Sequence, residues 1–295
     1  MSMLRGATLT TTDLDAAVAR YRDFLEYAVV ESGRVPETLA ASWGAPSAAG
    51  RRYELMRPAS GESVFLRFVE GERPPGFLSL RTYGWAAIEL CVRDTLAVNA
   101  RLESSPFRII GPPRELDGLP TIFPMQVEGP DGDVVFLTQI RGDLPEYDLP
   151  RARSLVDRLF IVVLACSDIG ESMRWFSTTL GVELGRRIEI AYSVLSAAFS
   201  LPETQRHTIA TGVQGRDCFL EFDQYPTQAA VRPGREHDLK PGIALTTLEH
   251  ARFESIPTAE WIAPPQPGPG LAYDGRRAAT LRAPDGALVE VIEAG

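Results

Sequence analysis

The sequence predicts an α+β fold in which a βαβββ unit occurs four times. An internal repeat carries this prediction: the tetrapeptide GPDG at residues 129–132 returns 154 positions later as APDG at residues 283–286, each time before a short apolar run. Pairs 155 positions apart are Asp13 and Asp168, Tyr21 and Phe176, Leu25 and Leu180, and Ile88 and Ile243. This near-constant offset indicates that one unit of about 150 residues is written twice.

The order of predicted elements divides each half into two units. Residues 4–11 form a run typical of a strand, Thr12 and Asp13 supply an N-cap, and apolar residues then recur at helical spacing up to Leu25. We expect the remaining elements of the N-terminal half as strands at 28–32, 53–56, 63–69, 85–92, 107–110, 121–127 and 134–139 and a helix at 94–103. In the C-terminal half we expect strands at 159–166, 218–222, 243–248 and 287–292, a helix at 169–180 and a loop at 263–270.

Two domains and a linker follow from this division. The segment 141–154 contains Pro145 and Pro150 among mixed charges, which favours a linker. We expect an N-terminal domain at residues 1–140 and a C-terminal domain at residues 155–295, with unit boundaries near 75, 150 and 235. We expect the two units of each half to pair into one incomplete barrel.

Composition excludes several classes of function. A net charge of −9 and a pI near 5.0 argue against nucleic-acid binding, which requires a basic surface. No apolar run approaches the roughly 20 residues of a membrane span, and the N-terminus lacks the apolar segment of a signal peptide. The three cysteines lie in apolar runs, which favours buried, reduced thiols in a cytoplasmic protein over a nucleophilic cysteine.

The helix openings at Thr12-Asp13-Leu14-Asp15 and Ser167-Asp168-Ile169, together with the two PDG closures, resemble the vicinal oxygen chelate superfamily. This superfamily includes glyoxalase I, bleomycin-resistance proteins and extradiol ring-cleaving dioxygenases. The resemblance covers essentially the whole chain, and four units resemble the two-domain layout of the extradiol enzymes. It implies two incomplete barrels, each with inward-facing strand residues that bind a divalent metal.

The resemblance also implies where metal ligands belong. The first-strand positions fall on Gly6, Ala87, Ile161 and Gly242, none of which can bind a metal. The last-strand positions fall on Arg67, Phe136, Glu221 and Glu290. The N-terminal half therefore offers no ligand, and we expect no metal there. In the C-terminal half Glu221 and Glu290 remain, and we expect them to face one cavity. A divalent metal there needs a further ligand from His207, His237 or His250, the three histidines of the chain. The cofactor is otherwise unknown.

Alternative interpretations stay open for these residues. The histidines are more often surface or loop residues, and the two glutamates are otherwise solvent-facing strand residues. Without a metal, two convergent glutamates repel each other, so one would have a raised pKa and could act as a general acid or base. Arg67 could bind a substrate carboxylate or simply lie exposed. Phe136 and Phe222 could line an apolar pocket or belong to the core.

The sequence thus leaves several functions open. One is an enzyme with a degenerate metal site that acts on a small aromatic or oxygenated compound in the C-terminal cleft, by isomerase, lyase or dioxygenase-type chemistry. Another is a non-catalytic small-molecule binding protein of the bleomycin-resistance type. A third assigns the N-terminal half a purely structural role, supporting the other half or a homodimer. We expect a small-molecule ligand and neither a nucleic acid nor a membrane as partner.

Overall fold

The computed structural model describes residues 3–116 and 118–295 and contains four βαβββ-type units, here numbered in chain order. Unit 1 comprises β1 (Leu4–Thr11), α1 (Leu14–Leu25), β2 (Tyr27–Arg34), β3 (Arg52–Pro58) and β4 (Phe65–Glu70), with α2 (Glu37–Ser42) inserted. Unit 2 comprises β5 (Gly84–Val92), α3 (Thr95–Leu102), β6 (Arg108–Gly111), β7 (Ile122–Glu128) and β8 (Val134–Ile140).

Units 3 and 4 repeat this order with one difference. Unit 3 comprises β9 (Val156–Cys166), α4 (Ile169–Leu180), β10 (Glu183–Ala191), α5 (Ser193–Ala198), β11 (Arg206–Gln214) and β12 (Asp217–Gln224). Unit 4 comprises β13 (Ile243–His250), β14 (Gln266–Pro267), β15 (Arg277–Arg282) and β16 (Leu288–Glu293). In unit 4 two 3₁₀ turns, Phe253–Ser255 and Thr258–Glu260, stand where the other units have a helix. Pro257 separates these turns and cannot donate the backbone hydrogen bond that a longer helix would need there.

The units pair in an order that differs from our expectation. One eight-stranded sheet has the order β14-β15-β16-β13-β1-β4-β3-β2, so it joins units 4 and 1, and we call it sheet 1/4. The other has the order β10-β11-β12-β9-β5-β8-β7-β6 and is called sheet 2/3. The expected pairing of sequence neighbours within each half is therefore wrong. At the centre of each sheet the first strands of two units run antiparallel, β1 beside β13 and β5 beside β9.

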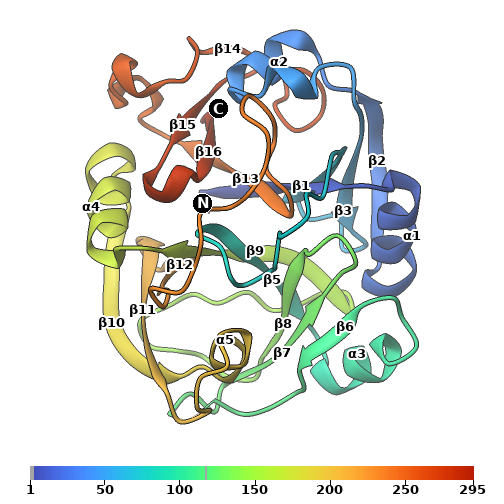
Figure 1. Cartoon of the computed structure of the whole chain (residues 1–295), viewed down its shortest axis with the longest axis vertical. Coiled ribbons are helices and arrows are strands. Elements are labelled where there is room, and N and C mark those ends of the chain that lie inside the picture. The colour runs from blue at the N-terminus through green and yellow to red at the C-terminus, as the bar shows by residue number, and fades with distance from the viewer. Residues whose placement is uncertain (1–2, 117) are drawn as a thin grey trace.

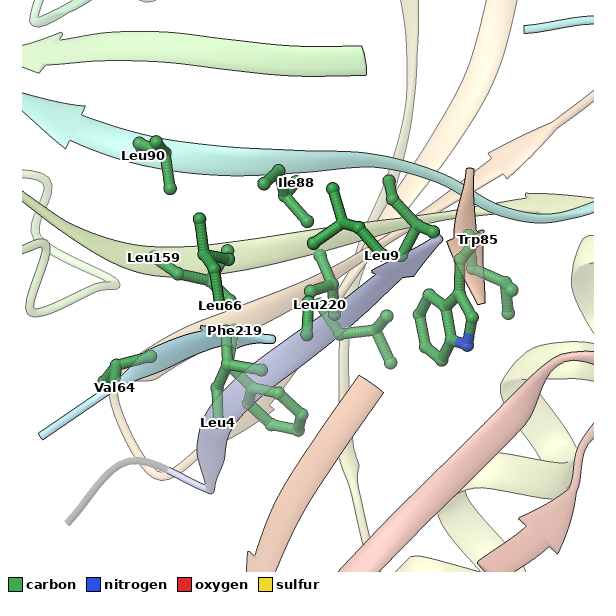
Figure 2. Close-up of a cluster of buried hydrophobic side chains, with 14 of the residues drawn as sticks. Leu4, Leu9, Val64, Leu66, Trp85, Ile88, Leu90, Leu159, Phe219 and Leu220 are labelled. Atoms are coloured by element: carbon green, nitrogen blue, oxygen red, sulfur yellow. The ribbon is translucent and has the colours of Figure 1, made fainter. Parts of the chain in front are cut away.

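The two sheets stack against each other, with sheet 1/4 above sheet 2/3 and helices α1 and α4 on opposite sides of the molecule (Figure 1). A shared hydrophobic core fills the space between the sheets. Leu9 and Leu66 reach it from sheet 1/4, and Ile88, Leu90 and Leu220 reach it from sheet 2/3 (Figure 2). Because side chains alternate along a strand, the residues between these point to the outer face of each sheet.

The repeated sequence motifs join elements of different sheets. Asp13 and Asp168 cap α1 and α4 by accepting hydrogen bonds from Ala16 and Glu171, which confirms both predicted helix starts. In the first PDG turn Asp131 accepts hydrogen bonds from both hydroxyls of Thr11 and Thr12 and pairs with Arg20 at 2.6 Å. Asp131 belongs to unit 2 and these partners to unit 1, so the turn ties sheet 2/3 to sheet 1/4. Asp285 makes the corresponding contact with Ser167 N at 2.8 Å.

Among the helices that the structure describes, none is long and apolar enough to cross a membrane. The three cysteines are buried and free.

Candidate functional site

The outer face of sheet 1/4 has an ion pair at its centre. Arg67 on β4 and Glu290 on β16 lie 3.8 Å apart and are 2% and 1% exposed. Glu290 also accepts hydrogen bonds from Trp43 Nε1 at 2.7 Å, Tyr273 OH at 2.7 Å and Thr247 Oγ1 at 2.8 Å. The carboxylate is therefore fully engaged by protein groups, as a buried charge requires.

The Arg67 guanidinium is equally enclosed. It donates to Tyr273 OH at 2.9 Å and to Thr8 Oγ1 at 3.3 Å, and it lies 5.2 Å from the ring centroid of Trp43 and 5.3 Å from that of Tyr273. Burial alone would lower the pKa of Arg67, but Tyr273 and Glu290 outweigh it and raise this pKa. A fixed cation thus occupies the centre of this face, where a second cation would be repelled.

The outer face of sheet 2/3 has the opposite character. Glu89 on β5 and Glu221 and Asp223 on β12 lie near one another on this face, because only β9 separates the two strands and its residues Ile161 and Val163 are paired with Glu89 and Glu221. Glu89 is 9% exposed, Asp223 is 1% exposed and Glu221 is half-buried. None of the three forms an ion pair with any residue in the described part of the chain. Three acidic groups therefore share a largely buried region without a counter-ion.

Burial is the main reason why all three carboxyl groups hold protons more tightly than usual. Burial and the nearby Glu221 raise the pKa of Glu89 to about 8, against the hydrogen bond that Thr138 donates to it at 2.5 Å. Burial raises the pKa of Asp223 to about 7, although hydrogen bonds from Glu221 and Tyr192 oppose the shift. Burial and the charge of Asp223 raise the pKa of Glu221 well above its usual range. Near neutral pH, Glu221 is thus a proton donor and Asp223 the first of the pair to ionise.

Aromatic rings adjoin these carboxyl groups. Phe136 on β8 lies directly beside Glu89 in the parallel β5–β8 pair, and its ring meets that of Tyr192 edge to face at 6.3 Å. The Tyr192 ring is in turn 6.4 Å from that of His207. Burial and the charge of Asp223 raise the pKa of Tyr192, so its phenol stays protonated and can donate a hydrogen bond.

The structure separates the two glutamates that we expected to share one cavity. Glu221 lies on the outer face of sheet 2/3 and Glu290 on the outer face of sheet 1/4, with the shared core between them. The expected cavity containing both is therefore wrong, because units 3 and 4 belong to different sheets. Glu290 is instead paired with Arg67, a residue that we had placed in a separate half.

The expected histidine ligands are also accounted for by other contacts. His250 lies with Nε2 2.9 Å from Leu180 O, while its Nδ1 accepts from Arg252 N, so both ring nitrogens are engaged in the core. His237 is exposed in a loop beside Glu236. His207 is on the same outer face as Glu221 and Asp223, but its Nε2 hydrogen-bonds Ser196 Oγ at 2.9 Å, and burial lowers its pKa.

The donor groups do not fit the divalent metal that the resemblance implies. Within residues 3–116 and 118–295, no group of three or more His, Cys, Asp or Glu side chains is arranged to hold a metal ion. On sheet 1/4 the central position is taken by Arg67. On sheet 2/3 the positions beside Glu89 and Glu221 are held by Phe136, Ile161 and Val163, which have no donor atoms.

Phe222 does not belong to the carboxyl site. It is fully buried on the inner face of β12, where its ring packs against Phe176 at 5.4 Å. This contact is opposite to the direction of Glu221 and Asp223, because neighbouring residues of a strand point to opposite faces.

Sequence reasoning missed Glu89 and Asp223. Glu89 is the one charged residue of the nine in β5, two positions after Ala87, where we had looked for a ligand. Asp223 is two positions after Glu221, so strand alternation alone places both on one face. Tyr192 precedes the short helix α5 and reaches the site only in the folded chain.

Solved structures share this fold over the full length of the chain. Glyoxalase I from Zea mays is 16% identical with a TM-score of 0.66, and the match covers 99% of this chain and 92% of that one. A Bacillus subtilis protein assigned as a dioxygenase is 11% identical with a TM-score of 0.61, over 99% of this chain and 85% of the other. No family model matches the chain, and no curated protein matches it. The chain therefore has the fold of the vicinal oxygen chelate superfamily, with four units in two sheets.

Proposed function

We propose that the outer face of sheet 2/3 binds a small aromatic or oxygenated organic compound and moves protons on it without a metal. The observation that supports this most is the set of Glu89, Glu221 and Asp223, three carboxyl groups whose pKa values are raised toward or above neutrality. Groups with such pKa values exchange protons efficiently near pH 7. The expected C-terminal cleft becomes a site built by units 2 and 3.

The pair formed by Glu221 and Asp223 suits isomerase or lyase chemistry next to a carbonyl group. In such a step the Asp223 carboxylate would accept the proton from the carbon beside the carbonyl, while Glu221 would donate its proton to the carbonyl oxygen. The product is the neutral enol. Asp223 then returns its proton to a different carbon while the Glu221 carboxylate takes back the enol O–H proton, which completes an isomerisation. Two carboxyl groups whose surroundings separate their proton affinities can serve as base and acid in this way.

A second candidate is binding without turnover. The rings of Phe136 and Tyr192 favour it, because they provide apolar surface beside the carboxyl groups that can hold an organic ligand whether or not a proton moves. The closed ion pair of Arg67 and Glu290 favours a structural role for sheet 1/4 under either candidate.

A single experiment separates these candidates. A panel of aromatic ketones, hydroxyketones and diones would be screened by thermal shift, and each stabilising compound would be incubated with the protein in D₂O. Proton NMR would follow exchange at the carbon next to the carbonyl. Exchange that is lost in Glu221→Gln and kept in Glu203→Gln, an exposed glutamate of the loop before β11, supports the enzyme. Stabilisation without exchange supports the binding protein, and stabilisation that is unchanged in Glu221→Gln contradicts the site.

A further inference from the structure

We infer that the carboxyl site on the outer face of sheet 2/3 takes an organic cation, a protonated amine attached to a flat apolar group. The inference rests on the proposed function, because it names the ligand class of that same site. It starts from a difference between the two sheets: Glu89, Glu221 and Asp223 have no cationic partner among the described residues, whereas Glu290 on sheet 1/4 has Arg67.

An unpartnered buried oxygen gives independent support. Asp223 is 1% exposed, and its Oδ1 has no hydrogen-bond partner in the described part of the chain, so the hydrogen bonds from Glu221 and Tyr192 leave this one oxygen unsatisfied. A buried carboxylate oxygen without a donor is costly, and folded proteins rarely leave one in that state. Glu221 lies two residues away on the same face, and Tyr192 approaches from the position just before α5, so this oxygen belongs to the same site. The group that it lacks is a hydrogen-bond donor.

The surrounding groups favour an ammonium over other donors. An ammonium group carries three N–H donors and a positive charge, so it can satisfy Asp223 Oδ1 and a second carboxyl oxygen at once. The faces of Phe136 and Tyr192 attract a cation through their quadrupoles. A metal ion would need several ligand atoms within a tight shell, which this arrangement does not supply.

Sheet 1/4 contains a protein-built version of the same arrangement. There the cation is the Arg67 guanidinium, which meets the Glu290 carboxylate and the rings of Trp43 and Tyr273. On sheet 1/4 the Glu290 carboxylate is thus neutralised by a side chain of the protein itself. On sheet 2/3 the position in β8 that lies beside Glu89 is Phe136, so the cation must come from outside.

Proton release tests the inference directly, because the carboxyl groups of the free protein hold protons that a bound cation would displace. The probes would be benzylamine, benzyl alcohol and benzoate, which share a ring and differ in charge. Isothermal titration calorimetry in two buffers of different ionisation enthalpy counts the protons released. We expect benzylamine to bind more tightly than the other two and to release protons at pH 6.5. Its affinity should rise about five- to tenfold between pH 6 and pH 8, as Asp223 ionises.

Variants assign the binding to these residues. Asp223→Asn and Glu221→Gln should each weaken benzylamine binding at least about tenfold, while Glu203→Gln, with the same change in net charge, should leave it unchanged. Circular dichroism melting would confirm that each variant is folded. Tighter binding of benzyl alcohol or benzoate at this site, or an affinity for benzylamine that falls as pH rises, overturns the cation inference and leaves the proposed site intact. If no probe binds, or if both site variants bind benzylamine as the wild type does, the cation inference is overturned. If, in addition, no compound of the thermal-shift screen stabilises the protein, the proposed site is overturned as well.

Discussion

Glu221 and Glu290 occupy the same kind of position, on the last strand of their units, yet they lie on opposite outer faces of the molecule. Glu290 has a cationic partner there, and Glu221 has none among the described residues. Glu290 receives three hydrogen bonds and pairs with Arg67. Glu221 lies among other carboxyl groups, and burial raises its pKa. A glutamate at this position therefore forms a stabilising ion pair in sheet 1/4, and in sheet 2/3 it is a carboxyl group that holds its proton near neutral pH.

Removing the charge of Arg67 should strongly destabilise the protein. In Arg67→Met the Glu290 carboxylate remains buried without its cation, a change that typically costs about 3–5 kcal/mol. The double variant Arg67→Met/Glu290→Gln removes both charges and should cost clearly less than the sum of the two single changes. Urea unfolding of the four proteins measures this. Additive losses would show that the ion pair does not couple these residues.

The stability contributed by Glu89 should depend on pH. Its folded pKa of about 8 lies above the ordinary glutamate value of 4.5, so between these values the folded protein keeps a proton that the unfolded chain releases. The contribution of Glu89 to the free energy of unfolding is therefore complete below pH 4.5 and is lost as the pH rises toward 8. The free energy of unfolding of Glu89→Gln should therefore increase by about 1–3 kcal/mol relative to that of the wild type between pH 5 and pH 8. Urea unfolding at both values checks this, and an equal difference at both would mean that Glu89 titrates normally.

A polar pair in one half is replaced by an apolar pair in the other. Tyr21 OH donates to Asp133 Oδ2 at 2.8 Å, and burial raises the pKa of Asp133 to about 6. At the equivalent positions the other half has Phe176 and Ala287. Tyr21→Phe alone should cost about 1–3 kcal/mol, because it leaves a buried carboxyl group without its donor.

The double variant Tyr21→Phe/Asp133→Ala copies the pair of the other half. It should cost at least about 1 kcal/mol less than the sum of the single changes. Thermal unfolding by calorimetry gives the comparison. Full additivity would indicate that the two side chains act independently and that the hydrogen bond contributes nothing.

The sequence was sufficient for the fold class and insufficient for the pairing of units. The repeat at offset 154–155 and the caps at Asp13 and Asp168 predict four units, and the structure confirms these features. The same offset is compatible with pairing units 1 and 2 or units 1 and 4. It shows that the two halves are similar in sequence, but it does not show which units are in contact. Only the antiparallel contact of β1 with β13 decides between the two.

The candidate site was predictable in part for the same reason. Glu221 was found from its position in the repeat, but its neighbour Glu89 comes from unit 2 and meets it only across the sheet. Tyr192 lies outside the strands, just before α5, and approaches only in the folded chain. Arg67 and Glu290 were each singled out, yet their ion pair depends on the contact between units 1 and 4. Strand alternation was enough to place Asp223 beside Glu221, and that residue could have been predicted from the sequence.

The most direct test of the account is a carbon-13 NMR titration of the side-chain carboxyl groups of Glu89, Glu221 and Asp223, assigned by single substitutions to Gln or Asn. We expect Asp223 to titrate near pH 7, Glu89 near pH 8, and Glu221 well above the usual range of a glutamate. Benzylamine should lower these midpoints, because a bound cation favours the ionised carboxylates. Titration of all three groups between about pH 4 and pH 5, as in an exposed carboxylate, would contradict the account.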